Sequence, residues 1–365
     1  NLVQNGDFSE EGVQEVSNGS FSQEGSEVVV NGDFATDSDW VKGNGITIDG
    51  GKANFINSTG DLRQDPVVEN GKYYKVTYTI SNYVSGSVRF EIPSNIGSGI
   101  ERSANGTYTE ILLSSGTAIQ FDGRTAFTGS IESVSVREVG QDWILGTGWS
   151  IAEDKAVATN APSGERLRQN NVFTAGKTYK VTYEITELTQ GGFQGYVGGT
   201  NITTRSAVGV YTETLVAPLN DVFYIRTIGT TTGSITNISV KEVGQNWVLN
   251  DWSVGDSLAL SGNTSSLLQQ PTIYTSITSI YKTTFRARSV SGASVSLRLY
   301  DGGGSNYETF TITSSNFQDF ELTRQRAGSN STLSLQNNLS EEIEITNISI
   351  IEITTDTSLP RINYE

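Results

Sequence analysis

"TGSIESVSVREVGQDW" (residues 128–143) recurs almost unchanged as "TGSITNISVKEVGQNW" (residues 232–247), and "EIEITNISIIEIT" (residues 342–354) repeats its pattern a third time. Each copy alternates apolar and polar residues, which is typical of a β-strand with one buried face. The first two copies run into a Trp across only Val-Gly-Gln. Recurrence at a period of about 105 residues predicts tandem copies of one domain, each joined closely to the next.

Other phrases recur in the same order and place the domain boundaries. A strand-like phrase occurs three times, as "GKYYKVTYTIS" (71–81), "GKTYKVTYEIT" (176–186) and "SIYKTTFRARS" (279–289). A phrase that opens each domain also occurs three times, as "DWVKGNGITIDGGKA" (39–53), "DWILGTGWSIAEDKA" (142–156) and "NWVLNDWSVGDSLA" (246–259). We therefore predict domain 1 at residues 28–140, domain 2 at 141–245 and domain 3 at 246–354. Residues 355–365 are interpreted as a linker to a further domain.

The composition favours an all-β fold. Short runs of alternating hydrophobicity are bounded by Gly and Asn, and helix-period stretches are hard to find. About 105 residues and roughly eight short strands per unit suit a β-sandwich of the jelly-roll type. Because the connections between units are short, we expect three tandem jelly-roll domains stacked as a rod.

Charge and missing residue types exclude several function classes. The chain has 40 acidic and 24 basic residues, a net charge of −16, which argues against nucleic-acid binding and adsorption to anionic membranes. No apolar run approaches the ~18 residues of a membrane helix, so no membrane insertion is expected. The chain contains no Cys and no His, and its acids form no distinctive catalytic pair. We expect no enzymatic activity.

The N-terminus repeats a short phrase. Asn5, Asn18 and Asn31 each begin an Asn-Gly-x-Phe unit, and the units are 13 residues apart. Only the third unit leads into a domain, and domains 2 and 3 lack the phrase at their own beginnings. We therefore interpret residues 1–27 as an extended arm of 13-residue repeats. It would add strands to an edge of domain 1, pair with a neighbouring chain, or remain mobile.

The ordered set of phrases, beginning with "VVVNGDFATDSDW" (residues 28–40), resembles the carbohydrate-binding-module-like jelly rolls appended to glycanases. It is also similar to the tandem copies of this module in bacteriophage tail-fibre and other virion surface proteins. The resemblance covers roughly residues 28–354. It implies a non-enzymatic structural or adhesive segment at the virion surface, whose partners are other virion proteins, copies of itself and a host-surface glycan bound weakly and multivalently.

Two alternatives stay open at this point. The first is a carbohydrate-binding or adhesin segment of a secreted bacterial protein, located outside the cell or on its surface. The second is a self-assembling filament or a capsid-decorating subunit, whose outer faces would carry apolar interfaces.

Three tyrosines are the candidate glycan-binding residues. Tyr196, Tyr300 and Tyr307 interrupt the repeat, whereas Trp40 and its equivalents recur at the same register and suit a structural role. Aromatic rings stack on the apolar face of a sugar, and function tends to lie where a repeated scaffold varies. We therefore assign these three tyrosines to glycan binding.

The family resemblance also implies a structural calcium ion in many members. Domain 1 offers Asp33, Asp37 and Glu132 for such a site, since calcium prefers carboxylate and other oxygen ligands. The closing strands of domains 2 and 3 carry Thr236 and Thr346 where domain 1 has the glutamate. The expectation is therefore a calcium ion in domain 1 or no cofactor at all.

Overall fold

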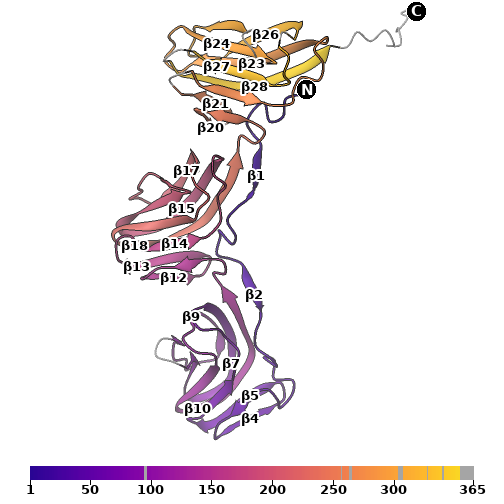
Figure 1. Cartoon of the computed structure of the whole chain (residues 1–365). Coiled ribbons are helices and arrows are strands. Elements are labelled where there is room, and N and C mark those ends of the chain that lie inside the picture. The colour runs from indigo at the N-terminus through magenta and orange to yellow at the C-terminus, as the bar shows by residue number, and fades with distance from the viewer. Residues whose placement is uncertain are drawn as a thin grey trace, which may run out of the picture.

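The computed structural model describes residues 1–93, 97–255, 257–262, 265–302, 307–326, 328–338 and 341–353. All the regular structure among these residues is β-strand, arranged as three tandem jelly-roll sandwiches in a rod (Figure 1). No helix in the described part of the chain is long and apolar enough to cross a membrane. The expected linker at residues 355–365 lies outside the described residues.

Domain 3 shows the sandwich most simply, because its two antiparallel sheets are separate. The first sheet has the order β20 (Trp252–Gly255), β21 (Leu258–Ser261), β28 (Ile343–Ile353), β23 (Ile280–Ser289) and β26 (Gln318–Gln325). The second sheet has the order β19 (Val248–Asn250), β22 (Leu267–Gln270), β27 (Leu333–Asn337), β24 (Val295–Asp301) and β25 (Glu308–Ile312).

Domains 1 and 2 use the same frame, but two long strands in each pass through both sheets. These are β7 (Tyr73–Ile92) and β10 (Ile119–Val139) in domain 1, and β15 (Thr178–Val197) and β18 (Phe223–Val243) in domain 2. A break in register between Arg124 and Thr128 marks the bend in domain 1. Gly86 lies opposite this bend with φ 76°, and a Cβ there would come within 2.7 Å of Ala126. The bend therefore requires a residue without a side chain.

The shorter strands complete the two sheets of each domain. In domain 1 they are β3 (Val41–Lys42), β4 (Ile46–Asp49), β5 (Lys52–Ser58), β6 (Asp61–Gln64), β8 (Gly97–Ser98) and β9 (Gly106–Leu113). In domain 2 they are β11 (Ile144–Leu145), β12 (Trp149–Ala152), β13 (Lys155–Ala161), β14 (Arg166–Gln169), β16 (Thr200–Asn201) and β17 (Gly209–Val216).

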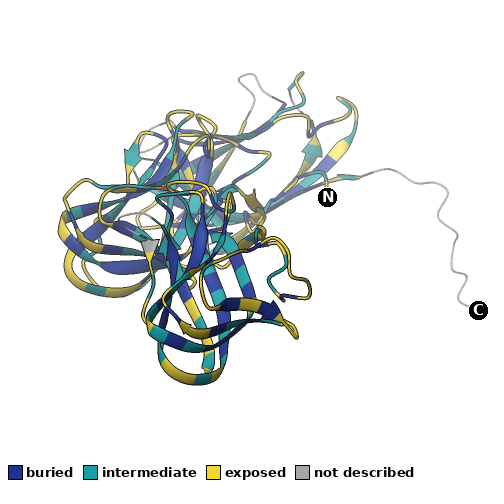
Figure 2. Ribbon diagram, turned by 90° about the horizontal axis from the view of Figure 1, so that it is seen from below, coloured by how far each residue is buried: buried dark blue, intermediate teal, exposed yellow. Residues whose placement is uncertain are grey.

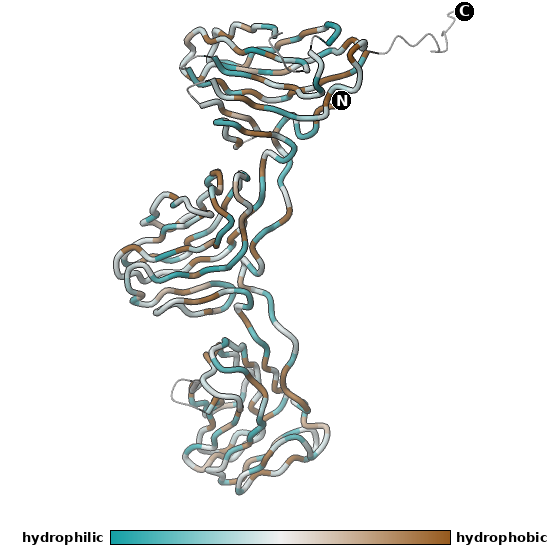
Figure 3. Tube along the Cα trace, viewed as in Figure 1, coloured by the Kyte–Doolittle hydropathy of each residue, from teal (hydrophilic) through white to brown (hydrophobic). Residues whose placement is uncertain are grey.

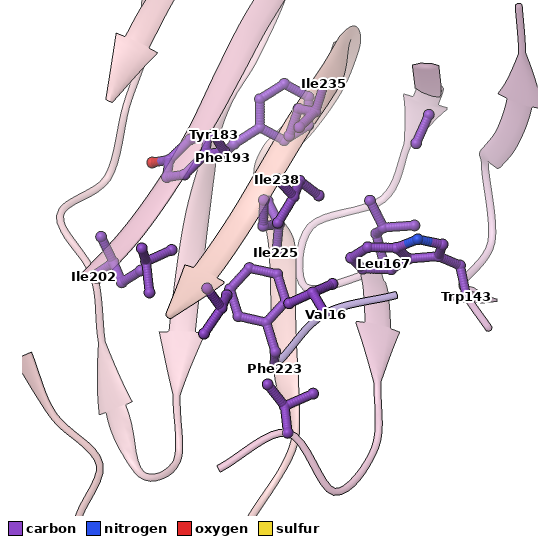
Figure 4. Close-up of a cluster of buried hydrophobic side chains, with 14 of the residues drawn as sticks. Val16, Trp143, Leu167, Tyr183, Phe193, Ile202, Phe223, Ile225, Ile235 and Ile238 are labelled. Carbon is purple, nitrogen blue, oxygen red and sulfur yellow. The ribbon is translucent and has the colours of Figure 1, made fainter. Parts of the chain in front are cut away.

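Each sandwich encloses its own hydrophobic core. Alternate residues point inward along each strand, as Val76, Tyr78 and Ile80 do on β7, and the residues between them are half-buried (Figures 2 and 3). In the domain 2 core, Val16 of the N-terminal arm lies among the side chains of the domain (Figure 4). The arm therefore contributes to a core that begins more than 100 residues later in the sequence.

The three Asn-Gly-x-Phe units complete the three domains in reverse order. Their phenylalanine rings pack on the opening tryptophans with centroid distances of 5.2, 5.2 and 5.4 Å, in the pairs Phe8–Trp247, Phe21–Trp143 and Phe34–Trp40. The expectation that the first two units have no domain behind them was wrong. Domains 2 and 3 do have this opening segment, but it is supplied by the N-terminal arm, which runs back along the rod (Figure 1).

The same polar contacts hold each unit. The tryptophan Nε1 donates to the carbonyl of the unit's asparagine at 3.0–3.1 Å, in the pairs Trp247–Asn5, Trp143–Asn18 and Trp40–Asn31. One glutamine per domain binds the backbone of the residue just before each asparagine: its side-chain nitrogen donates to the carbonyl, and its side-chain oxygen accepts from the amide. The pairs are Gln270–Gln4, Gln169–Ser17 and Gln64–Val30. Because every unit makes equivalent contacts, the arm has three equivalent binding positions.

The phrase Asn-Gly-x-Phe follows from the backbone it must adopt. Asn18 has φ 45° and Phe21 has φ 58°, so both lie in the left-handed region, which asparagine tolerates well. A Cβ on Gly19 would lie 1.9 Å from the carbonyl oxygen of Ile238, and the Ile238 amide donates to the Gly19 carbonyl at 2.9 Å. Only glycine allows the arm to approach this strand closely enough.

Two short arm strands cross the junctions between domains. β1 (Glu11–Gln14) pairs with the end of β18, and β2 (Glu24–Glu27) pairs with the end of β10. Each junction is thus crossed twice by the chain, once by the Val-Gly-Gln connection and once by the arm. Val139 and Val243 at the ends of these strands belong to the core of the following domain. We infer that the double connection limits bending of the rod.

The first prediction concerns the pH dependence of this attachment. Hydrogen bonds from Lys180 and Lys241, at 2.8 and 2.9 Å, lower the pKa of Glu11 below its ordinary value. A lowered pKa in the folded state stabilises the arm at pH above the ordinary value, and this contribution is lost as the pH falls through the lowered pKa. We expect Glu11→Gln to increase amide exchange in β1 at pH 7, and the difference from the parent to disappear once the pH falls below the lowered pKa of Glu11. Glu10→Gln is the control, since Glu10 is exposed; an equal effect of both variants at pH 7 would contradict the assignment.

Candidate functional site

The outward face of the second sheet carries different residues in each of the three domains. Strand register places Glu91, Tyr196 and Tyr300 at the same position, opposite Gln120, Tyr224 and Ser334 respectively. The next strand then contributes Arg63, Arg168 and Gln269. One backbone frame therefore presents three chemically different faces.

In domain 3 this face contains a pocket of about 340 Å³. Its lining consists of one aromatic ring, one leucine, three amides and two hydroxyls: Tyr300, Leu267, Gln269, Asn330, Gln336, Thr332 and Ser334. The Tyr300 hydroxyl donates to Gln336 Oε1 at 2.8 Å, and Gln269 Nε2 donates to Ser334 Oγ at 2.8 Å. These bonds hold the ring and the amides in place, and further amide hydrogen-bonding capacity remains for a ligand.

Tyr307 extends the same surface beyond the pocket. Its ring lies 5.2 Å from that of Tyr300 at an interplanar angle of 53°, and the Arg298 guanidinium lies 4.5 Å from its centroid. Tyr307 is 40% exposed, so it remains accessible next to the pocket. The Tyr300 and Tyr307 rings, set at an angle to each other, therefore form one continuous aromatic surface.

In domain 2 the equivalent face carries a stack of side chains. The Tyr196 and Tyr224 rings are parallel within 5° at 4.4 Å, and the Arg166 guanidinium lies 4.4 Å from the Tyr224 centroid. The Tyr196 hydroxyl donates to Asp221 Oδ2 at 3.3 Å. Burial, followed by the negative charge of Asp221, raises the pKa of Tyr196, so its hydroxyl stays protonated. Tyr224 is buried between its neighbours, whereas Tyr196 is half-exposed at the end of the stack.

In domain 1 the equivalent face is occupied by internal ion pairs. Arg89 pairs with Glu91, and Arg124 pairs with Asp122 at 3.2 Å. Burial, followed by the adjacent Asp122 carboxylate, raises the pKa of Asp61. Arg89 and Arg124 are thus paired with acids within this face, so it offers less to a ligand than the other two faces.

The structure thus brings Tyr300 and Tyr307 together and places Tyr196 at the equivalent position of another domain. Sequence reasoning missed Tyr224 and Arg166, which complete the stack around Tyr196. The alternation in "FYIRTI" (residues 223–228) points Tyr224 outward, but which strands lie beside it depends on the sheet order.

The three acids considered for calcium are not gathered into one site. Asp37 pairs with Lys42, Glu132 pairs with Lys52 at 3.5 Å, and Asp33 accepts from the Ala35 amide at 3.3 Å. Among the residues that the structure describes, no group of three or more acidic side chains is placed to hold a metal ion. The donor set proposed for domain 1 therefore does not fit a calcium ion in this arrangement.

No protein-family model matches the chain, and no curated protein matches its sequence. A family 4 carbohydrate-binding module (CBM4) is 13% identical, with 29% of this chain and 78% of that chain covered and a TM-score of 0.23. The tandem CBM22 domains of Paenibacillus barcinonensis Xyn10C are 7% identical, with 59% and 94% covered and a TM-score of 0.26. A triple jelly-roll turret protein of an archaeal virus is 14% identical, with 80% and 81% covered and a TM-score of 0.19.

The fold rests on the strands and cores described above, which define the chain as an all-β protein of tandem jelly-roll sandwiches.

Proposed function

We propose that this chain is a non-enzymatic glycan-binding rod, whose principal sugar-binding site is the Tyr300 pocket of domain 3. The observation that carries the proposal is the composition of that pocket, in which one aromatic ring lies among amides and hydroxyls. A tyrosine ring provides an apolar surface for the C–H face of a sugar, and amides provide paired donors and acceptors for its hydroxyls. A volume of about 340 Å³ is at the lower end of the range of small-ligand sites.

The lining also supports binding without catalysis. None of the residues that line the Tyr300 pocket is acidic, whereas glycoside hydrolysis ordinarily needs two carboxylates across the scissile bond. The proposed site needs no metal and no cofactor.

A rod whose three domains are joined both by short connections and by the N-terminal arm suits an appendage that holds binding sites away from a surface. In our proposal the chain is a segment of a phage tail fibre or a similar virion appendage, attached to other virion proteins and directed at a host-surface glycan. Several weak sites on one rod, multiplied over copies of the chain, would gain avidity through effective concentration. Mass spectrometry of purified virions tests this location, and finding the chain only in secreted bacterial material would contradict it.

Glycan-array binding of the full chain tests the site itself. We expect Tyr300→Ala to weaken binding about 10-fold or more, because stacking on a ring and the placement of Gln336 are lost together. Val210→Ala is the matched control, because Val210 is exposed on the first sheet of domain 2. Binding by the parent chain that Tyr300→Ala leaves unchanged would exclude this pocket.

A further inference from the structure

The outward face of domain 2 carries three arginines with no acidic partner. Arg166, Arg168 and Arg226 lie on neighbouring strands, with Arg166 directly opposite Arg226 and Arg168 directly opposite Tyr224. None of the ion pairs found among the described residues involves any of the three. This is unexpected in a chain with 40 acidic and 24 basic residues, where most arginines could find a carboxylate nearby.

The contacts of Arg166 and Arg226 keep these two side chains oriented without neutralising them. Arg166 lies over the Tyr224 ring at 4.4 Å, and Arg226 donates from Nε and a terminal nitrogen to Gln194 Oε1 at 3.0 and 2.5 Å. A neutral amide and an aromatic face fix a guanidinium group but leave its positive charge uncompensated. The carboxylate of Asp221 approaches the same face through the Tyr196 hydroxyl.

The equivalent positions of the other domains show that the fold does not require this charge. Domain 1 has Asp61 and Asp122 where domain 2 has Arg166 and Arg226, and domain 3 has Leu267 and Gln336. Like charges directly opposite each other on neighbouring strands destabilise a sheet. In domain 1 the facing acids Asp61 and Asp122 have arginines beside them, whereas the two facing arginines of domain 2 have no acidic partner among the described residues. The Arg166–Arg226 pair is therefore an unfavourable choice for folding, which an anionic ligand bound between the two strands would compensate.

We propose that the face of domain 2 formed by Arg166, Arg168 and Arg226 binds an anionic glycan, one whose sugars carry carboxylate or sulfate groups. The guanidinium groups would bind the anionic groups through charge-assisted, two-pronged hydrogen bonds, and the half-exposed Tyr196 ring would contact the sugar. This assignment rests on the proposed glycan-binding function. It gives the rod two specificities, an acidic sugar on domain 2 and a neutral sugar in the domain 3 pocket.

Calorimetry with the full chain and paired probes tests the assignment. The pairs are trigalacturonate with its methyl ester, and chondroitin sulfate with desulfated chondroitin, a set that separates carboxylate from sulfate recognition. We expect at least one anionic probe to bind about 10-fold or more tightly than its partner with the lower charge, with affinity that falls as salt rises. The double variant Arg166→Gln, Arg226→Gln should lose this preference, while Arg286→Gln, which removes a charge from domain 3, should retain it.

Folding of the double variant is checked separately. The substitution removes a like-charge contact together with the contacts to Tyr224 and Gln194, so the melting temperature of the variant should stay close to that of the parent. Polyglutamate serves as a polyanion without sugars, and binding it as tightly as the anionic glycans would overturn the proposal.

The two proposals fail in different ways. If neutral glycans bind through Tyr300 and the anionic probes show no preference that depends on the arginines, the domain 2 assignment fails and the glycan-binding function stands. If no glycan of either kind binds, both fail.

Discussion

Deletion of residues 1–10 is expected to unfold domain 3 while domain 1 remains folded. The deletion removes Phe8 from its contact with Trp247 and takes Val3 out of the same core. Truncating one buried phenylalanine commonly costs about 3–5 kcal/mol, within a total domain stability of about 5–15 kcal/mol. The deletion also removes both hydrogen-bond partners of Gln270, which is only 2% exposed, and each unsatisfied buried group adds about 1–3 kcal/mol.

Hydrogen exchange resolved along the chain measures this effect. Amides of β23 and β28 should lose protection in the shortened chain, while those of β7 and β10 retain it. A synthetic peptide of residues 1–10, added at high concentration, should restore protection in domain 3, because this part of the arm is held there by non-covalent contacts. Val13→Ser, at a 77% exposed position of the arm, is the control. Full protection of β28 in the shortened chain would refute the role of the first unit.

Gly19→Ala is expected to detach the second unit from domain 2. The new Cβ would lie 1.9 Å from a backbone carbonyl oxygen, that of Ile238, which cannot rotate away as a side chain could. Overpacking alone costs about 1–3 kcal/mol, and the loss of Phe21 from the core about 3–5 kcal/mol if the arm is displaced. The arm should therefore leave its position, and domain 2 should unfold at lower denaturant concentration than in the parent.

Gly12→Ala provides a close comparison for this variant. Its Cβ would meet the end of the flexible Gln245 side chain at 3.0 Å, and the nearest backbone atom, the Glu242 oxygen, would be 3.3 Å away rather than 1.9 Å. Denaturant unfolding followed by the fluorescence of the tryptophans, with exchange data to assign the domain, should show a large shift for Gly19→Ala and a small one for Gly12→Ala. Equal shifts would mean that close backbone approach is not the reason for the glycine in the phrase.

The tyrosine assignments show which parts of the candidate site could be predicted from local sequence pattern. Tyr300 and Tyr307 could be selected because they interrupt the repeat and lie on either side of a glycine-rich sequence. The contact of Tyr300 with Gln336 depends on the pairing of β24 with β27, whose residues are more than 30 positions apart. The unpaired arginines of domain 2 could not be recognised either, since an arginine lacks a partner only in relation to neighbours supplied by other strands.

The sequence alone determined the all-β class, the number of domains and their order, because alternation and repetition are properties of local segments. Only the tertiary structure decided which domain each arm unit completes. The three units share the Asn-Gly-x-Phe phrase, so this phrase does not distinguish the three tryptophans. The pairing of units with domains follows from chain geometry, because the third unit continues directly into domain 1. The spacing of 13 residues then places the second unit beyond the first junction, at domain 2, and the first unit beyond the second junction, at domain 3. Phe21 therefore packs on Trp143 and Phe8 on Trp247.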